Sequence, residues 1–193
     1  MTLRSAQRLH LVRHGQTAFS ARGAYSGQME IALTSTGRDQ ARRAGERLSG
    51  AGIDAIRSSP LSRARDTAQA IAAATGAAFA VDERLTEVGF GPLEGLDREA
   101  AQRRFGTPFA DWRADPFGSP LPGTEPLGEA LERARAATAD VLDSCDAPVI
   151  VAHQGILRLV LVALGRIEPD DYFSTRLREA EPMEVVAPRI RCG

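Results

Sequence analysis

The sequence predicts an α/β fold: a three-layer α/β/α sandwich whose mainly parallel central sheet carries helices on both faces. Short apolar runs typical of buried strands alternate along the chain with stretches whose apolar residues recur at helical spacing. This alternation favours parallel strands joined by helical crossovers. The 193 residues contain no internal repeat and no Gly/Ser-rich linker. We therefore expect a single domain over residues 1–193.

The first half of the chain predicts two strands that are each followed by a helix. Residues 8–12 (RLHLV) are mostly apolar and end in a Gly-containing turn, which indicates a buried strand. From Leu33 the pattern becomes helical, and Thr34 or Thr36 can cap the helix. A short strand over 54–57 leads into the second helix. The apolar stripes of the two helices are Ala41, Ala44, Gly45 and Leu48, and Ala64, Ala68, Ile71 and Thr75.

The second half predicts further strands and helices around one irregular stretch. Residues 86–124 are rich in Gly and Pro, with one helix near 97–105, and long ordered loops of this kind are often functional. The β-branched run 148–152 (PVIVA) predicts a buried strand. The other expected elements are a strand at 79–81 after Gly76, an amphipathic helix over 127–142, a buried helix over 156–164 and a last strand at 183–186.

The charged residues exclude several function classes. All 24 basic residues are arginines, so a P-loop lysine, a Schiff-base lysine and a lysine general base are excluded. The formal net charge of −1 argues against a nucleic-acid partner, because such proteins need an excess of cations. No run of about 18 apolar residues predicts a membrane span. We expect a cytoplasmic protein that acts on a small molecule; its oligomeric state is not predicted.

The cysteines and histidines do not suggest a metal centre. Cys145 and Cys192 are far apart in sequence, so they form neither a disulfide framework nor a metal knuckle. Only three histidines occur, without the spacing of a zinc site. We expect neither a metal nor another cofactor.

Two of the three histidines directly follow predicted strands. His14 follows the first strand, next to Arg13, and His153 follows the PVIVA strand. Because the carboxyl ends of parallel strands open onto one edge where ligands bind, we expect the two histidines to meet there. The alternative is that each only satisfies a hydrogen bond at a strand end. His10 lies inside the first strand and is assigned no role.

An arginine at the start of the second helix points to an anion at the same edge. Arg63 lies in the predicted first turn, where a cation is unfavourable against the positive end of the helix dipole unless an anion is bound. Arg65 is a weaker candidate, because an exposed arginine is its ordinary interpretation. Two arginines, two histidines and backbone N–H groups in one crevice describe a phosphoryl site. A neutral imidazole there can attack phosphorus and form phosphohistidine, and the arginines make Mg²⁺ unnecessary.

A phosphohistidine route also needs an acid that protonates the leaving oxygen. Glu87 opens the Gly-rich stretch, where a partly desolvated carboxyl can serve as that acid. From the spacing alone, Asp82, Glu83 and Glu94 are alternatives.

Together these motifs resemble the histidine phosphatase superfamily, in its phosphoglycerate-mutase-like branch. The resemblance spans roughly residues 8 to 165. It rests on an ordered set of motifs: LVRHGQT at 11–17, LT, G and QA within 33–41, SSPL, RA and TA within 58–68, LTE, FG and EG within 85–95, and VAH at 151–153.

The resemblance implies a role for each site residue. His14 is the phosphorylated nucleophile, Glu87 is the proton donor, and Arg13, Arg63 and His153 clamp the phosphate. Two further phosphate contacts are implied with departures from the pattern. Gln154 stands where many members have Gly, so its backbone N–H faces phosphate, and Ser20 stands where relatives often carry Asn, so its hydroxyl replaces the amide.

Within the family, the chain is most similar to phosphatases, because the mutases carry inserted segments that cap the site. Residues 25–27 and 153–155 are similar to α-ribazole phosphatase of cobalamin biosynthesis. A broad-specificity sugar-phosphate phosphatase and a phosphoglycerate mutase are alternatives. An inactive phosphate-binding relative is an alternative from another class. The loop 90–125 supplies substrate-contacting walls or core through Phe105, Phe109, Trp112 and Phe117.

Overall fold

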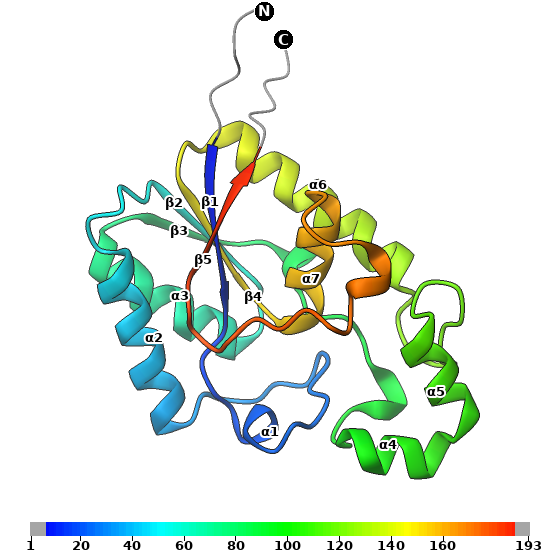
Figure 1. Ribbon diagram of the computed structural model, residues 1–193. Helices are drawn as coiled ribbons and strands as arrows, with labels where there is room; N and C mark the ends of the chain where they lie inside the picture. Colours follow the sequence, from blue (N-terminus) through cyan, green and yellow to red (C-terminus); the bar gives the residue numbers. More distant parts are fainter. Residues whose placement is uncertain (1–6, 188–193) are drawn as a thin grey trace, which may run out of the picture.

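A five-stranded sheet forms the centre of the structure, a computed structural model that describes residues 7–187 (Figure 1). The strand order is β3-β2-β4-β1-β5. The first four strands are parallel, and β5 runs antiparallel to β1 at one edge. This confirms the predicted α/β fold. The strands are β1 (Gln7–Arg13), β2 (Ala55–Ser58), β3 (Ala78–Val81), β4 (Pro148–Ala152) and β5 (Met183–Ala187).

Helices cover both faces of the sheet (Figure 1). Helices α2 (Ser35–Leu48) and α3 (Ser62–Thr75) pack on one face, and α6 (Leu127–Ser144) and α7 (Gln154–Ala163) pack on the other. Successive side chains of a strand point to opposite faces, so each central strand feeds both cores. In β4, Val149 and Val151 join the core under α2 and α3, whereas Ile150 and Ala152 join the core under α6 and α7.

The remaining helices lie at one end of the sheet, where the parallel strands end. Figure 1 shows α1, α4 and α5 at this end, opposite the end where β1 begins. The connections after the parallel strands therefore build one face of the molecule. Its elements are α1 (Ala18–Ala21), α4 (Arg98–Phe105) and α5 (Thr107–Ala114), with short 3-10 helices at η1 (Glu83–Leu85), η2 (Gly91–Leu93) and η3 (Pro169–Asp171).

The predicted elements recur with small changes at their ends, and two helices were not predicted. Thr34 rather than Thr36 caps α2, because its side chain accepts the N–H of Gly37. Helix α5 falls inside the stretch that was predicted to be irregular apart from one helix. It follows Gly106, whose φ of +56° ends α4, and only Phe109 and Trp112 mark its buried side. The four residues of α1 are too few to give a periodic pattern.

Two expectations from the sequence concern membrane-spanning helices and the cysteines. No helix within residues 7–187 is long and apolar enough to cross a membrane. Cys145 is a free cysteine, and Cys192 lies outside the described residues.

Candidate active site

The first site residues lie where β1 ends. Arg13 is the last residue of β1, and His14 follows it directly. The loop runs against two helices: the N–H of Gly15 donates to Thr67 Oγ1 on α3 (3.1 Å), and a Cβ on Gly15 would collide with the backbone of Gly37 on α2. Gly15 is therefore needed for this close approach, which holds His14 in place.

The His14 ring is held in one tautomer. Its Nδ1 lies 2.7 Å from the carbonyl oxygen of Gly15, and because a carbonyl can only accept, Nδ1 carries the hydrogen. The Nε2 atom then keeps its lone pair. Burial, together with the charges of Arg13 and Arg63, holds the pKa of His14 well below its ordinary value of 6.5. His14 is thus a neutral imidazole with a free nitrogen.

Arg63 lies in the first turn of α3, as predicted, and its side chain is fully buried. Its Nη1 donates to Met29 O and its Nη2 to Gly27 O, both at 2.7 Å, and its Nε donates to His153 Nδ1 at 3.2 Å. These bonds fix the guanidinium plane, and each terminal nitrogen keeps a second hydrogen for a ligand.

His153 caps α7 directly after β4, and its ring centroid lies 5.2 Å from that of His14. The two histidines therefore meet at the sheet edge. Because Arg63 can only donate, His153 Nδ1 is the acceptor and Nε2 carries the hydrogen, which Ser59 Oγ accepts at 2.7 Å. Burial first and Arg63 second hold the pKa of His153 well below 6.5. Both ring nitrogens are engaged, so a contact with phosphate requires Nε2–H to leave Ser59.

Glu87 lies at the N-terminus of α7. Its Oε1 accepts the N–H groups of Val88 (2.8 Å) and Ile156 (2.9 Å), and its Oε2 accepts that of Gly155 (3.0 Å). These donors hold the carboxyl group in place, and together with the positive end of the helix dipole they stabilise it whenever it carries a negative charge. Oε2 accepts only one of the three bonds, so it keeps the more accessible position for a proton. Gly155 leaves space for this arrangement, because a Cβ there would lie 2.6 Å from Glu87 Oε1.

The three other acidic candidates lie elsewhere. Asp82 pairs with Arg84 at 2.7 Å, and Glu83 is exposed. Glu94 supports the loops, since its Oε1 accepts the N–H groups of Gln28 and Phe90. Arg65, the weaker cation candidate, is exposed on α3.

Two of the predicted phosphate ligands have structural contacts of their own. Gln154 orients Arg13, because its Oε1 accepts from Arg13 Nη1 (3.2 Å) while its Nε2 donates to Thr175 O (3.1 Å). Glu87 accepts hydrogen bonds from the backbone N–H groups of Val88, Gly155 and Ile156 but not from that of Gln154, so a contact of this N–H with phosphate stays a prediction. The Ser20 hydroxyl closes a capping box with Thr17 and donates to Thr17 O, so it must turn before it can reach a phosphate.

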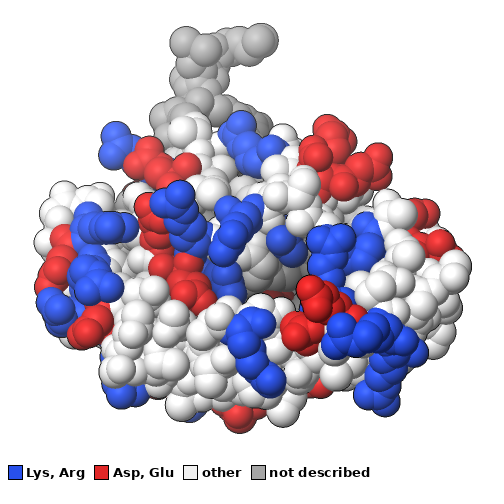
Figure 2. All heavy atoms as spheres, turned by 60° about the horizontal axis from the view of Figure 1, so that its bottom comes forward, with Lys and Arg blue, Asp and Glu red and all other residues white. Residues whose placement is uncertain are grey.

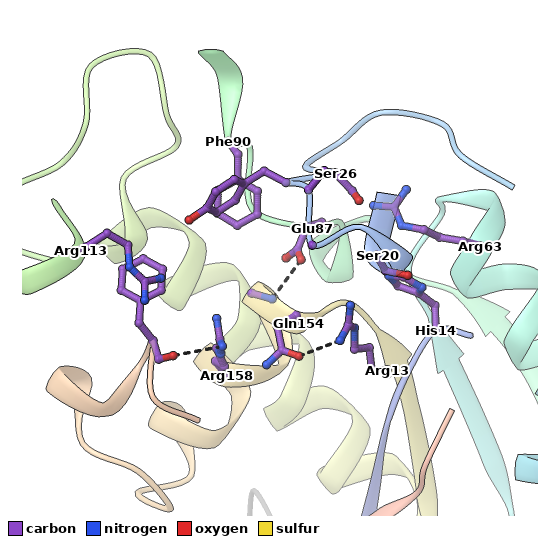
Figure 3. Close-up of a pocket in the computed structure, with 15 residues that line it drawn as sticks. Arg13, His14, Ser20, Ser26, Arg63, Glu87, Phe90, Arg113, Gln154 and Arg158 are labelled. Carbon is purple, nitrogen blue, oxygen red and sulfur yellow. Dashed lines mark hydrogen bonds between the residues drawn. The ribbon is translucent and has the colours of Figure 1, made fainter. Parts of the chain in front are cut away.

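Most of the predicted site residues line one pocket of about 230 Å³. Figure 2 shows the hollow on the face at the strand ends, with Arg side chains gathered around it. Figure 3 shows Arg63 and His14 at one end, with Glu87 and Gln154 in the middle. The residues predicted from the sequence that line it are Arg13, His14, Ser20, Arg63, Glu87 and Gln154; His153 lies behind them, beside His14.

The far end of the pocket contains residues that the sequence analysis missed. Arg113 of α5, Arg158 of α7 and Phe173 line it. Arg158 left one signal, since it is the single charged residue of α7 (QGILRLVLVA). Arg113 left none, because it lies in a helix that was not predicted.

The aromatic residues of the 90–125 loop are mostly core. Phe109 and Trp112 are each about 1% exposed, and neither lines the pocket. Phe105 and Phe117 pack against the same core. Phe90 does line the pocket. The wall interpretation is therefore wrong for the four aromatic residues on which it was based.

The arrangement can bind and attack a phosphoryl group. A neutral nitrogen nucleophile, fixed guanidinium donors and a carboxyl group occupy one small pocket, which is the set that phosphoryl transfer to histidine requires. Within residues 7–187, no three His, Cys, Asp or Glu side chains are grouped so that they could hold a metal ion.

Comparison with protein families and known proteins agrees with this geometry. The model of the histidine phosphatase superfamily (branch 1) matches residues 9–187. The chain is 33% identical over 180 residues to "Putative phosphoserine phosphatase 2" of Hydrogenobacter thermophilus, covering 93% of this chain and 89% of that protein. It is 31% identical over 185 residues to a 2,3-bisphosphoglycerate-dependent phosphoglycerate mutase of Azorhizobium caulinodans, covering 91% and 89%.

Solved structures show the same fold. A mycobacterial glucosyl-3-phosphoglycerate phosphatase superposes with a TM-score of 0.82 at 28% identity, covering 93% of this chain and 90% of that one. A structure described as "a putative alpha-ribazole-5'-P phosphatase" from Escherichia coli superposes with a TM-score of 0.78 and covers 98% and 99%. At 23% sequence identity, this similarity supports a shared fold only.

Proposed function

The chain belongs to the histidine phosphatase superfamily, and from that premise we propose that it hydrolyses small phosphomonoesters through a phosphohistidine at His14. One observation carries the proposal. Gly15 O holds the hydrogen on Nδ1 of a buried, neutral His14, so Nε2 is left as the nucleophile in a pocket lined by Arg13 and Arg63.

In the first step, His14 Nε2 attacks phosphorus while the bond from phosphorus to the ester oxygen breaks. The electron pair leaves with that oxygen, which takes a proton from Oε2 of Glu87. Phosphorylation makes the imidazole ring cationic, and the bond from Nδ1–H to Gly15 O strengthens as it does. Arg13 and Arg63 hold the phosphoryl oxygens, where most of the negative charge lies.

In the second step, water attacks phosphorus and the P–N bond breaks. The electron pair returns to Nε2, and the Glu87 carboxylate accepts the proton of the water. The products are an alcohol and inorganic phosphate, and the neutral His14 is restored. For His153 we infer a supporting role: it orients Arg63, and its Nε2–H exchanges Ser59 Oγ for a phosphoryl oxygen when the ester binds.

The size of the pocket supports a small substrate. Its volume of about 230 Å³ lies below the roughly 300–1,000 Å³ that is typical of sites for drug-sized ligands. The narrower expectation, α-ribazole 5′-phosphate, has no support from a specific contact and is tested as one member of a substrate panel.

The test follows the fate of the phosphoryl group. The protein is mixed with p-nitrophenyl phosphate in ¹⁸O water, and a rapid quench is analysed for acid-labile phosphoenzyme. We expect phosphohistidine at His14, inorganic phosphate that contains one ¹⁸O, and no requirement for a bisphosphate primer. His14→Ala should abolish both signals.

The same experiment distinguishes the alternatives. A matched control is His10→Ala, which removes a different buried histidine, located within β1, that does not line the pocket. Transfer of the phosphoryl group to an added sugar phosphate, in a reaction that requires a bisphosphate primer, would identify a mutase. Phosphate binding without formation of a phosphoenzyme would identify an inactive relative. Near-normal turnover by His14→Ala would refute the assignment of His14 as the nucleophile.

A further inference from the structure

Beyond the phosphate site, the pocket has a second cationic end. Arg113 and Arg158 line it together with Tyr25, Phe90 and Phe173. Figure 3 shows the two arginines on the opposite side of Glu87 and Gln154 from His14 and Arg63. A phosphoryl group on His14 therefore leaves them free for another part of the ligand.

Aromatic rings rather than carboxylates hold these two cations. The guanidinium carbon of Arg113 lies 3.6 Å from the centroid of the Phe173 ring, and that of Arg158 lies 5.3 Å from the centroid of Tyr172. Cation–π contacts of this kind position a guanidinium group without neutralising it. Among the ion pairs in the part of the chain that the structure describes, none includes Arg113 or Arg158.

Both arginines keep part of their hydrogen-bonding capacity, although the side chain of Arg113 also interacts with that of Tyr25. Nε of Arg158 donates to Thr175 O (2.7 Å) and Nη2 to Phe173 O (3.4 Å), which fixes the side chain and leaves donors on its terminal nitrogens. Nε of Arg113 is buried and has no hydrogen-bond partner within residues 7–187. Burial is the largest influence and lowers the pKa of both groups; for Arg158, Tyr172 and Glu87 raise the pKa, and the charge of Arg113 lowers it. An anion bound between two partly buried cations that repel each other would therefore stabilise both of them.

We propose that Arg113 and Arg158 form a second anion subsite, and that the physiological substrate is a phosphomonoester with a second acidic group. The location of the first subsite rests on the function proposed above. The second group is a carboxylate or a further phosphate, because the planar fork of a guanidinium binds either one. Tyr25 and Phe90 contact the short apolar part that joins the two acidic ends.

The test uses ligands that cannot be hydrolysed, so that it does not depend on turnover. Calorimetry on the wild-type protein compares ω-carboxyalkyl phosphonates of one to five methylenes with alkyl phosphonates of the same length. Alkane bisphosphonates form a second arm, which distinguishes a carboxylate from a phosphate at the far end. We expect at least tenfold tighter binding of the diacids at one or two chain lengths, and the best length reports the span between the subsites.

Two variants test whether the preference belongs to these arginines. Arg113→Gln and Arg158→Gln should each reduce the preference for the diacid to less than about threefold, while alkyl phosphonates bind within threefold of wild type. A matched control is Arg98→Gln, because Arg98 is an exposed cation whose charge reaches Arg113 but which does not line the pocket. It should keep the preference.

Two results would overturn the subsite. One is equal binding of both ligand series by the wild type at every length, and the other is a preference that survives in both variants. These outcomes are separate from the proposed function. A protein that binds diacids tightly but forms no phosphohistidine would support the second anion subsite and refute the proposed phosphatase activity.

Discussion

A methyl group at Gly155 should displace Glu87, the proposed proton donor, without touching the proposed phosphate clamp. The Cβ of an alanine there would lie 2.6 Å from Oε1 and 3.2 Å from Cδ of Glu87, and 3.0 Å from the hydroxyl of Tyr172. The first distance is shorter than a van der Waals contact, so either the carboxylate or the start of α7 must move.

The size of the effect follows from what the carboxylate would lose. Moving it breaks or stretches the bonds from Gly155 and Ile156, each worth roughly 1.5–3 kcal/mol when the acceptor is charged. A displacement of about 1 Å costs on the order of 10²-fold in rate when it misaligns a catalytic group. We therefore expect kcat of Gly155→Ala to fall about 10²-fold for alkyl phosphates, whose leaving oxygen needs a proton.

The assay compares two leaving groups. With p-nitrophenyl phosphate, the leaving oxygen needs no proton, so the pre-steady-state burst of p-nitrophenolate should stay within about tenfold of wild type. A matched control is Gly128→Ala on α6, where a Cβ meets no atom within 4 Å, and this variant should keep full activity. Wild-type turnover of alkyl phosphates by Gly155→Ala would refute the role of the carboxylate position. Equal losses with both substrates would instead indicate damage to the phosphate clamp.

Three other outcomes are expected. Arg63→Ala should lower kcat/KM by about 10²–10³-fold, by analogy with the loss of an oxyanion donor, and a variant within tenfold of wild type would exclude Arg63 from the clamp. Phosphatase activity should persist in EDTA, because guanidinium groups supply the positive charge, and a loss that Mg²⁺ restores would contradict this. The free energy of unfolding in urea should fall as the pH drops below 6.5. In the unfolded state His14 and His153 then bind protons that they do not bind in the folded state. This lowers the free energy of unfolding by up to about 1.4 kcal/mol per pH unit for each proton. If the free energy of unfolding stayed constant or increased as the pH was lowered from 7 to 5.5, the two histidines would not be buried in the neutral form.

The positions of the strands and of the residues that follow them were readable from the sequence, because local patterns decide both. A β-branched run such as PVIVA predicts a buried strand, and His153 must then lie at its carboxyl end. The same reasoning brought His14 to the same edge. It also placed Arg63 correctly, since a helix start can be recognised from the turn before it.

Spacing alone did not distinguish Glu87, the acid that we propose, from the three other acidic candidates. The distinction depends on where α7 begins relative to the loop after η1, which is a tertiary contact between residues almost 70 positions apart. The tautomers of the two histidines were hidden for the same reason. Arg113 and Phe173 come from α5 and from the segment after η3, and no periodic pattern predicts that these two elements pack together.

The arginines of the pocket have a second effect that links affinity to reactivity. The charges of Arg13 and Arg63, added to burial, keep the pKa of His14 low, so the proposed nucleophile stays neutral before a substrate arrives. A bound phosphate cancels part of that positive charge. The imidazole then becomes a stronger base when phosphorus is in place, and its phosphorylated, cationic form is less destabilised. Removing Arg63 should therefore both weaken phosphate binding and raise the pKa of free His14. Titration of the His14 ring by NMR in the Arg63 variant should show this rise, and an unchanged pKa would mean that burial and Arg13 keep the ring neutral without Arg63.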